Sequence, residues 1–329
     1  MQANIISIYL LIKLGDMKID EFFTSYSTED SCKLFFRQQR EASGIFCRKC
    51  GGESHYWIES LSRWQCKKCR HSTTLKSGTV MENSNLGYRI WLWSLYFMSL
   101  TKKGFSALEL QRLVGHKRYE PIWGLMQKIR VTMGHRDEKY LLDGYIEMDE
   151  GFFEGHRKKE EKDGLTVKPV KELDRQVKAI VAVSTTPFAT DKHKKGKPIT
   201  KPGYLKMSVV QSLSKNDIGF EAKTMVGKDA TVVTDGKTAY RTLKDICKLH
   251  IEIVVADKTN VSKAFPWVHT AISNAKKKLL GLHHHVKDKY MQNYLNEFCY
   301  KFNRRYFGIK LFDRLIVAAI SCSWFKPCT

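Results

Sequence analysis

The chain has 329 residues, 43% of them hydrophobic, which is enough for two or three domains with buried cores. Its 56 Lys and Arg residues against 34 Asp and Glu residues give a formal net charge of +22, so an acidic polymer is a better partner than a small neutral substrate. Nine cysteines without a secretory signal indicate a reducing compartment, where clustered cysteines bind metal more often than they form disulfides. We therefore expect a cytoplasmic protein with no membrane partner.

Residues 1–44 are expected to form an N-terminal lead. Its apolar run IISIYLLI spans eight residues, too few to cross a bilayer, and lacks the basic start and cleavage site of a signal peptide. The first 16 residues are expected to be disordered, with Met17 as the expected initiator. A helical segment follows, for which Ser27 or Thr28 supplies an N-cap.

Residues 45–80 carry the sharpest motif, two CxxC pairs separated by fifteen residues. This spacing places four thiolates around one tetrahedral Zn²⁺ in a closed structural site, formed by Cys47, Cys50, Cys66 and Cys69. His55 is a rival ligand, although four cysteines leave it no place. The glycines, aromatic residues and alternation between the pairs predict the short hairpins of a zinc ribbon, whose folding depends on the metal.

Residues 81–140 predict a helical segment. The apolar stretch IWLWSLYFMSL (90–100) indicates a buried helix, and Ser106 is expected to cap a second helix that ends at Gly115. A third helix follows the basic turn that contains Lys117 and Arg118. The pattern is typical of a DNA-binding helix-turn-helix, and an ordinary helical hairpin with solvated basic residues is the alternative.

Residues 141–320 predict a mixed α/β sheet. Strands are expected in YIEMDEGFFEG, which should break at Gly151 as a hairpin, and then in VKAIVAVST, YLKMSVV, ATVVTDG and HIEIVVAD. A helix is expected after the third strand, and helices fill the chain from Trp267 onward. Within a basic insertion at about 155–204, the two segments GHRKKEEKDGLTVKPVKELDRQ and ATDKHKKGKPITKPG are expected to form long loops, either solvated or tracking phosphates.

Acidic residues end two of these strands. Asp149 and Asp235 lie where an open α/β sheet presents catalytic side chains, and Glu297 lies on a late helix that can cross the sheet. Three gathered carboxylates need cations, and hard oxygen ligands suit Mg²⁺ or Mn²⁺. Glu147 on the same strand face and Glu150 on the other compete with Asp149, and Asp235 could simply start a turn.

The order of motifs resembles the bacterial insertion-sequence transposases of the ISXO2-like group, which have an N-terminal zinc ribbon and an RNase H-like DDE catalytic domain. The resemblance covers roughly residues 45–318 and rests on EMDEGFFEG, VVTDGKTAY, WVHTAISNAKKKLLGLHHHV and YLNEFCYKFNRR. It implies that Asp149, Asp235 and Glu297 are the three metal-binding acids, with Asn293 or Asn296 as minor rivals of Glu297. It also implies that His284, Lys301, Arg304 and Arg305 contact DNA.

The function implied by this resemblance is DNA transposition. The chain would bind the terminal inverted repeats of an insertion sequence, hydrolyse the phosphodiester at each end and use the released 3′-hydroxyl to attack target DNA. Because two ends must be held together, a homodimer or larger assembly is expected. A catalytically silent DNA-binding protein and an RNase H-like nuclease are the alternatives.

Overall fold

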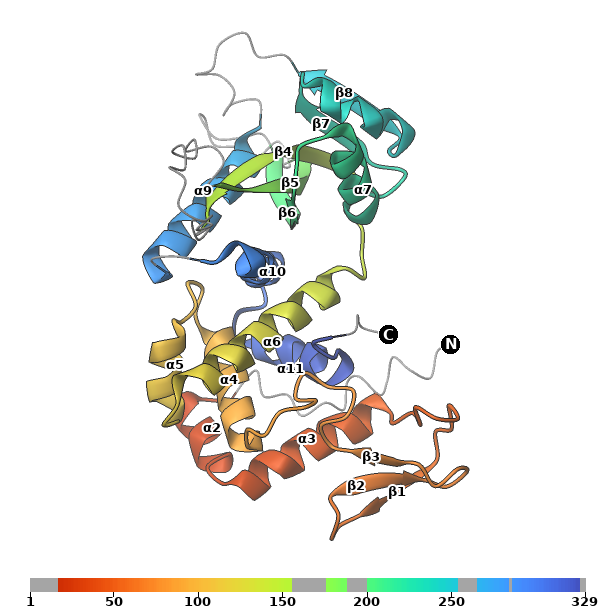
Figure 1. Cartoon of the computed structure of the whole chain (residues 1–329), viewed down its shortest axis with the longest axis vertical. Coiled ribbons are helices and arrows are strands. Elements are labelled where there is room, and N and C mark those ends of the chain that lie inside the picture. Colours follow the sequence, from red (N-terminus) through yellow and green to blue (C-terminus); the bar gives the residue numbers. More distant parts are fainter. Residues whose placement is uncertain (1–16, 156–175, 188–199, 254–264, 284–285, 326–329) are drawn as a thin grey trace, which may run out of the picture. The chain divides into compact units, whose positions relative to one another are not determined.

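The computed structural model describes residues 17–155, 176–187, 200–253, 265–283 and 286–325 (Figure 1). It has two compact units, one formed by residues 1–136 with 304–329 and the other by residues 137–303. The predictions for the first 16 residues, for most of the basic insertion and for His284 lie outside the described residues. Within the described residues, no helix is long and apolar enough to cross a membrane.

The first unit begins with two helices, α2 (Ile19–Ser25) and α3 (Glu29–Ser43). Thr28 caps α3 by accepting a hydrogen bond from the backbone N–H of Ser31, which decides between the two predicted caps. The Phe22 ring of α2 stacks on Tyr96 at 3.8 Å between centroids and meets Phe312 edge-on. These rings join the lead to α4 (Tyr88–Leu100) and α11 (Leu311–Ser321), so the predicted buried helix is confirmed.

A three-stranded antiparallel sheet follows α3, made of β1 (His55–Ile58), β2 (Arg63–Cys66) and β3 (Ser72–Thr74). The predicted short hairpins are therefore confirmed. Helix α3 contacts this sheet through two cation–π interactions. The guanidinium of Arg37 lies 4.5 Å from the Trp57 ring, and that of Arg40 lies 5.0 Å from the Trp64 ring. Arg40 also donates to the backbone oxygens of β3 and the following residue.

The turn between α5 (Ala107–Val114) and α6 (Tyr119–Asp137) has the predicted local chemistry. Ser106 and Glu109 form a capping box, and Gly115 ends α5 in the left-handed conformation, with φ of 68°. Lys117 and Arg118 are exposed in this turn. The predicted helix pair is thus confirmed, and two basic side chains are free to meet an anionic partner.

The second unit contains a five-stranded sheet of order β6-β5-β4-β7-β8. Its strands are β4 (Tyr145–Glu154), β5 (Gln176–Pro187), β6 (Thr200–Val210), β7 (Thr231–Asp235) and β8 (Leu249–Ile253). The pairs β4·β5 and β5·β6 are antiparallel, whereas β4·β7 and β7·β8 are parallel. The predicted mixed α/β fold is confirmed.

The predicted break at Gly151 is wrong. Strand β4 continues through this residue, which pairs with Ala179 of β5. A Cβ atom at Gly151 would lie 2.9 Å from the Phe153 ring and 3.3 Å from Val181. The glycine therefore allows close packing over the sheet instead of a turn.

Helices cover both faces of this sheet (Figure 1). One face packs on α9 (Pro266–Leu282) and α10 (Asp288–Asn303), and the other on α7 (Lys215–Met225) and the 3-10 helix η4 (Thr238–Asp245). Helix α10 also provides hydrogen-bond partners for the backbone of the outer strand β6. The Asn303 amide accepts from Leu205 N–H and donates to Leu205 C=O. The Gln292 amide accepts from Val209 N–H and donates to Met207 C=O. These contacts protect an otherwise open sheet edge.

The second unit ends at Asn303. Helix α11 packs with α4 of the first unit, and the backbone N–H of Val80 donates to Ala319 C=O at 2.8 Å. The bounds 141–320 of the catalytic domain stay a prediction.

Candidate metal centres

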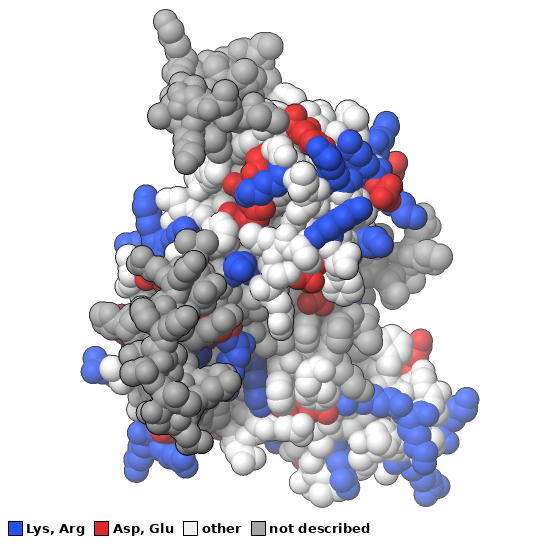
Figure 2. Space-filling model, turned by 45° about the horizontal axis from the view of Figure 1, so that its top comes forward, with Lys and Arg blue, Asp and Glu red and all other residues white. Residues whose placement is uncertain are grey.

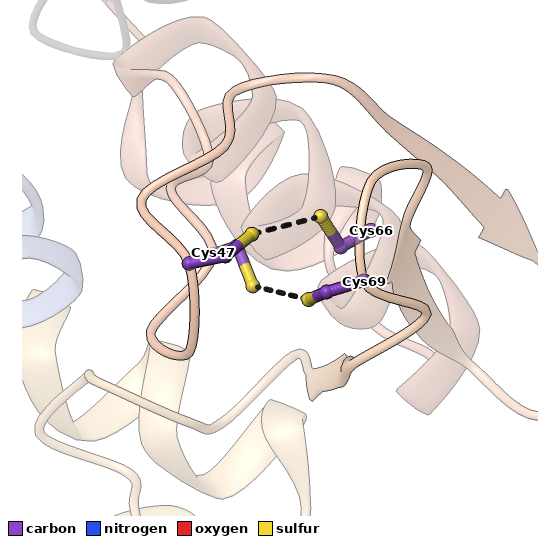
Figure 3. A group of neighbouring side chains, drawn as sticks. Cys47, Cys66 and Cys69 are labelled. Carbon is purple, nitrogen blue, oxygen red and sulfur yellow. Dashed lines mark hydrogen bonds between the residues drawn. The ribbon is translucent and has the colours of Figure 1, made fainter.

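Four cysteines from the two CxxC turns come together at one end of the three-stranded sheet (Figure 3). Their sulfurs lie within 4.8 Å of one another, with 3.4 Å between Cys47 Sγ and Cys69 Sγ and 3.6 Å between Cys50 Sγ and Cys66 Sγ. Four soft ligands at this spacing fit one tetrahedral Zn²⁺ and leave no open position. His55 is outside this group and its Nδ1 lies 3.0 Å from the backbone oxygen of Glu53.

The environment favours the thiolate form of Cys47 and Cys66, whereas at Cys69 the backbone N–H of His71 is outweighed by burial and by hydrogen bonds with the other three cysteines, which raise the pKa of Cys69 to about 12. Burial opposes ionisation of Cys47, but backbone N–H groups of Cys50 and Lys49 outweigh it and lower the pKa of Cys47 to about 6. The pKa of Cys66 is also lowered, chiefly by the backbone N–H of Cys69. Thiolate is the metal-binding form, so these backbone donors prepare the site for a cation.

Three carboxylates form a second candidate centre, where the middle of β4 lies beside the end of β7. The prediction that Asp149 ends its strand is wrong, because β4 continues to Glu154 in its pairing with β5. Oxygens of Asp149, Glu150 and Asp235 lie within 4.8 Å of one another. The parallel register explains this, because Glu147 pairs with Val233 and two further residues along each strand bring Asp149 beside Asp235. Hard oxygen donors gathered in this way suit Mg²⁺ or Mn²⁺.

Lys237 supplies positive charge to this acidic cluster, defined as Asp149, Glu150 and Asp235. Its Nζ forms a short ion pair with Glu150 Oε2 and lies 3.2 Å from Asp235 Oδ2. Burial alone would lower the pKa of Lys237, but the Glu150 and Asp235 carboxylates outweigh it and raise that pKa. The ammonium therefore stays charged beside the carboxylates.

Asp149 is the member of the acidic cluster with the most perturbed proton affinity. Burial first, and then its hydrogen bond with Glu150, raises the pKa of Asp149 to about 7. The same crowding raises the pKa of the buried Tyr240 well above its ordinary value, through burial and then through the charges of Glu150, Asp149 and Asp235. Tyr240 thus stays a neutral wall of the site, and a nearby cation would favour the charged form of Asp149.

Glu147, which lies on the same strand face as Asp149 and is the alternative candidate for the metal ligand, binds the start of helix α9. Its Oε2 accepts the backbone N–H groups of Trp267 at 2.8 Å and Val268 at 3.0 Å, in the first turn of α9. A carboxylate there satisfies orphan donors and complements the helix dipole. The contact also fixes His269 one residue later, whose Nδ1 lies 3.7 Å from Asp149 Oδ2.

The structure does not bring Glu297 into the acidic cluster. Glu297 lies on α10 with only 3% of its surface exposed, and its Oε1 lies 2.8 Å from Lys301 Nζ and 3.4 Å from Lys278 Nζ. Its predicted role as the third metal ligand stays a prediction. Of its two minor rivals, Asn296 accepts a hydrogen bond from Gln292 at 2.7 Å, and both asparagines are half-buried.

The residues predicted to contact DNA differ in their exposure. Lys301 is 7% exposed and paired with Glu297, so its ammonium is engaged inside the second unit. Arg304 and Arg305 are half-buried, and the Arg305 guanidinium lies 4.5 Å from the Tyr306 ring. Lysine and arginine side chains are spread over the visible face of the protein (Figure 2). The exposed pair Lys117 and Arg118 is thus the most accessible part of the predicted set.

Sequence reasoning missed Lys237 and His269. Lys237 follows the Asp-Gly turn by one residue, so the signal was present as a base next to a candidate acid. His269 had no such signal, because its approach to Asp149 depends on how Glu147 holds α9 against β4.

Comparison with known proteins identifies the two parts of the chain. Residues 141–303 match the family model of the ISXO2-like transposase domain, and residues 27–72 match that of the transposase zinc-ribbon domain. A relative from Halobacterium salinarum, described as an uncharacterized protein in transposable element ISH50, is 24% identical over 143 residues. That match covers 42% of this chain and 47% of the relative, so the chain spans about half of that protein's length.

We predict that Cys47→Ser lowers the zinc content of the purified protein, because three thiolates hold zinc more weakly than four. The ribbon should then lose its protection from proteolysis, whereas the second unit keeps its fold. Metal analysis and limited proteolysis measure the two effects, and Cys247→Ser, a buried cysteine outside the four-cysteine group, is the control. Full zinc occupancy in Cys47→Ser would contradict the four-thiolate site.

A second prediction concerns pH in magnesium-free buffer. The pKa of Asp149 is raised from 3.8 to about 7, so the folded state holds a proton that the unfolded chain has released. This contribution to stability is complete below the lower value and is lost as pH rises through the higher one. Between about pH 5 and about pH 8, the wild-type protein should lose on the order of 2 kcal/mol more unfolding free energy than Asp149→Asn. If the unfolding free energies of the two proteins change with pH in parallel, the pKa of Asp149 is not raised in the folded protein and the prediction is wrong.

Proposed function

Because the chain belongs to the insertion-sequence transposases that carry a zinc ribbon and an ISXO2-like transposase domain, we propose that it cuts the ends of an insertion sequence and joins them to target DNA. The observation that carries this proposal is the acidic cluster, whose three carboxylates converge from the middle of β4 and the end of the neighbouring strand β7. Such a cluster is costly without a cation, and phosphodiester chemistry uses divalent cations.

Asp149 and Asp235 would hold the metal, with Glu150 as the nearest further oxygen donor. A bound Mg²⁺ or Mn²⁺ would supply the Lewis acidity that activates water and stabilises charge on the departing oxygen. The protein contributes the arrangement: β4 and β7 fix the two aspartates, Glu147 fixes the start of α9, and Tyr240 closes the buried side with a neutral ring. Preorganisation of this kind is the main contribution of a protein scaffold to phosphoryl chemistry.

Recognition of the terminal inverted repeats would belong to the first unit. The α5–α6 pair carries exposed Lys117 and Arg118 at its turn, and the zinc ribbon adds further basic residues between its cysteines. Contacts to phosphates would set the register on DNA, and a few side chains would read base edges. The formal charge of +22 supports a binding energy dominated by phosphates. Two element ends require at least a homodimer.

Asp149→Asn and Asp235→Asn should each lower the rates of cleavage and strand transfer by more than about a hundredfold, while binding to element ends is kept. The control is Asp229→Asn, an exposed aspartate of the same unit, which should act like the wild-type protein. Nicking of DNA with an element end is measured in Mg²⁺ and Mn²⁺, beside binding to the same fragment. Equal activity of Asp149→Asn would overturn the proposed site. No cleavage by the wild-type protein, with normal binding, would indicate a silent DNA-binding protein, and cleavage of RNA–DNA hybrids alone would indicate a nuclease.

Glu297 needs a separate test, because its contacts support a positioning role beside the predicted metal role. The carboxylate joins the half-buried Lys278 of α9 to the buried Lys301 of α10, and its removal takes away the negative charge between the two ammonium groups. We expect Glu297→Gln to lower the unfolding free energy by about 1 to 3 kcal/mol and to leave Mn²⁺ affinity unchanged. Denaturation and Mn²⁺ titration measure the two quantities. A loss of Mn²⁺ affinity with unchanged stability would establish Glu297 as the third ligand.

A further inference from the structure

We propose that the Lys237 ammonium is the built-in counter-cation of the acidic cluster, and that a divalent metal must displace it to enter. This inference rests on the proposed function, since it concerns how the same carboxylates receive their metal. It assigns to Lys237 a positioning role that neither its exposure nor its place after a turn would indicate alone.

The geometry of the carboxylates carries the first step. Lys237 Nζ forms a short ion pair with Glu150 and lies 3.2 Å from Asp235 Oδ2, so it touches two of the three candidate metal ligands. Mg²⁺ binds oxygen ligands at about 2.0–2.1 Å, and an ion among these oxygens would therefore lie close to the ammonium. Two cations at such a separation repel strongly in a partly buried site. The metal and the ammonium cannot both occupy these positions.

The way Lys237 is attached explains how it can leave. Its backbone N–H donates to Asp235 Oδ1 at 3.3 Å, which ties the main chain of this residue to the turn after β7. Its side chain is 52% exposed, so the ammonium reaches the cluster from the surface and can turn into solvent. The long side chain thus moves while its anchor stays in place.

Displacement also leaves the ammonium near the centre. A DNA phosphate that approaches the metal brings negative charge to the place that Lys237 has just left, and a freed lysine at the rim is a suitable partner for it. Among the described residues, the other titratable groups near the ammonium are the three carboxylates of the acidic cluster, Tyr240 beside Glu150, and His269, whose Nδ1 lies 3.7 Å from Asp149 Oδ2. When metal and DNA bind, Lys237 would therefore pair with a DNA phosphate in place of the Glu150 and Asp235 carboxylates.

The test is a titration of full-length, zinc-loaded protein with Mn²⁺ alone, by calorimetry. Lys237→Met keeps the length of the side chain and removes the charge. It should bind Mn²⁺ roughly two- to thirtyfold more tightly than the wild-type protein, the factor expected for two partly exposed ion pairs. Lys237→Arg should stay near the wild-type affinity. Lys244→Met is the matched control, because Lys244 is 61% exposed and its Nζ lies 3.7 Å from Glu252, outside the acidic cluster.

Each outcome separates the inference from the proposed function. Tighter binding by Lys237→Met alone supports displacement of the ammonium. Unchanged or weaker binding by Lys237→Met overturns the inference while leaving the metal site intact, and equal tightening by Lys244→Met overturns it as a general effect of charge. If the double variant Asp149→Asn, Asp235→Asn binds Mn²⁺ as tightly as the wild-type protein, the proposed metal centre itself is wrong.

Discussion

The parallel pairing of β4 with β7 is the constraint on which the second unit depends. It joins residues almost ninety positions apart and brings the middle of β4 beside the end of β7, so that Asp149 and Asp235 become neighbours. A shift of register by one residue would turn one aspartate to the opposite face of the sheet. The apolar residues on either side prevent such a shift, because Ile146 and Met148 pack under α7 while Phe153 packs under α9 and α10.

This alignment creates an electrostatic problem that neighbouring groups reduce. Burial and Glu150 raise the pKa of Asp149 to about 7, which allows one proton to relieve the repulsion near neutral pH. Lys237 contributes a positive charge from the surface, and Glu147 is held apart by the first turn of α9. The acidic cluster is therefore kept together by a proton and an ammonium, both of which a divalent cation can replace.

Local chemistry made much of this structure predictable. The CxxC spacing places the four cysteines, Thr28 and Ser106 cap the helices for which they were proposed, and the strand patterns of the mixed sheet hold. The prediction that failed depended on contacts between distant segments: the sequence favours a turn at Gly151, whereas the structure packs Phe153 and Val181 close to this residue within a continuous strand. The metal role of Glu297 stays a prediction, and the spacing within YLNEFCYKFNRR does not reveal that Lys278 of the preceding helix lies beside it.

Helix α10, which carries the late motif, is linked to the acidic cluster through a series of contacts. Asn303 and Gln292 bind the backbone of β6, while Glu297 pairs with lysines of both α9 and α10. Helix α9 is in turn held at its start by Glu147, next to Asp149 on β4. Contacts thus run from the sheet edge through α10 and α9 to the acidic cluster. A charge lost at Glu297 would loosen the support of α9, and through it the position of His269 beside Asp149, even with every cluster carboxylate intact.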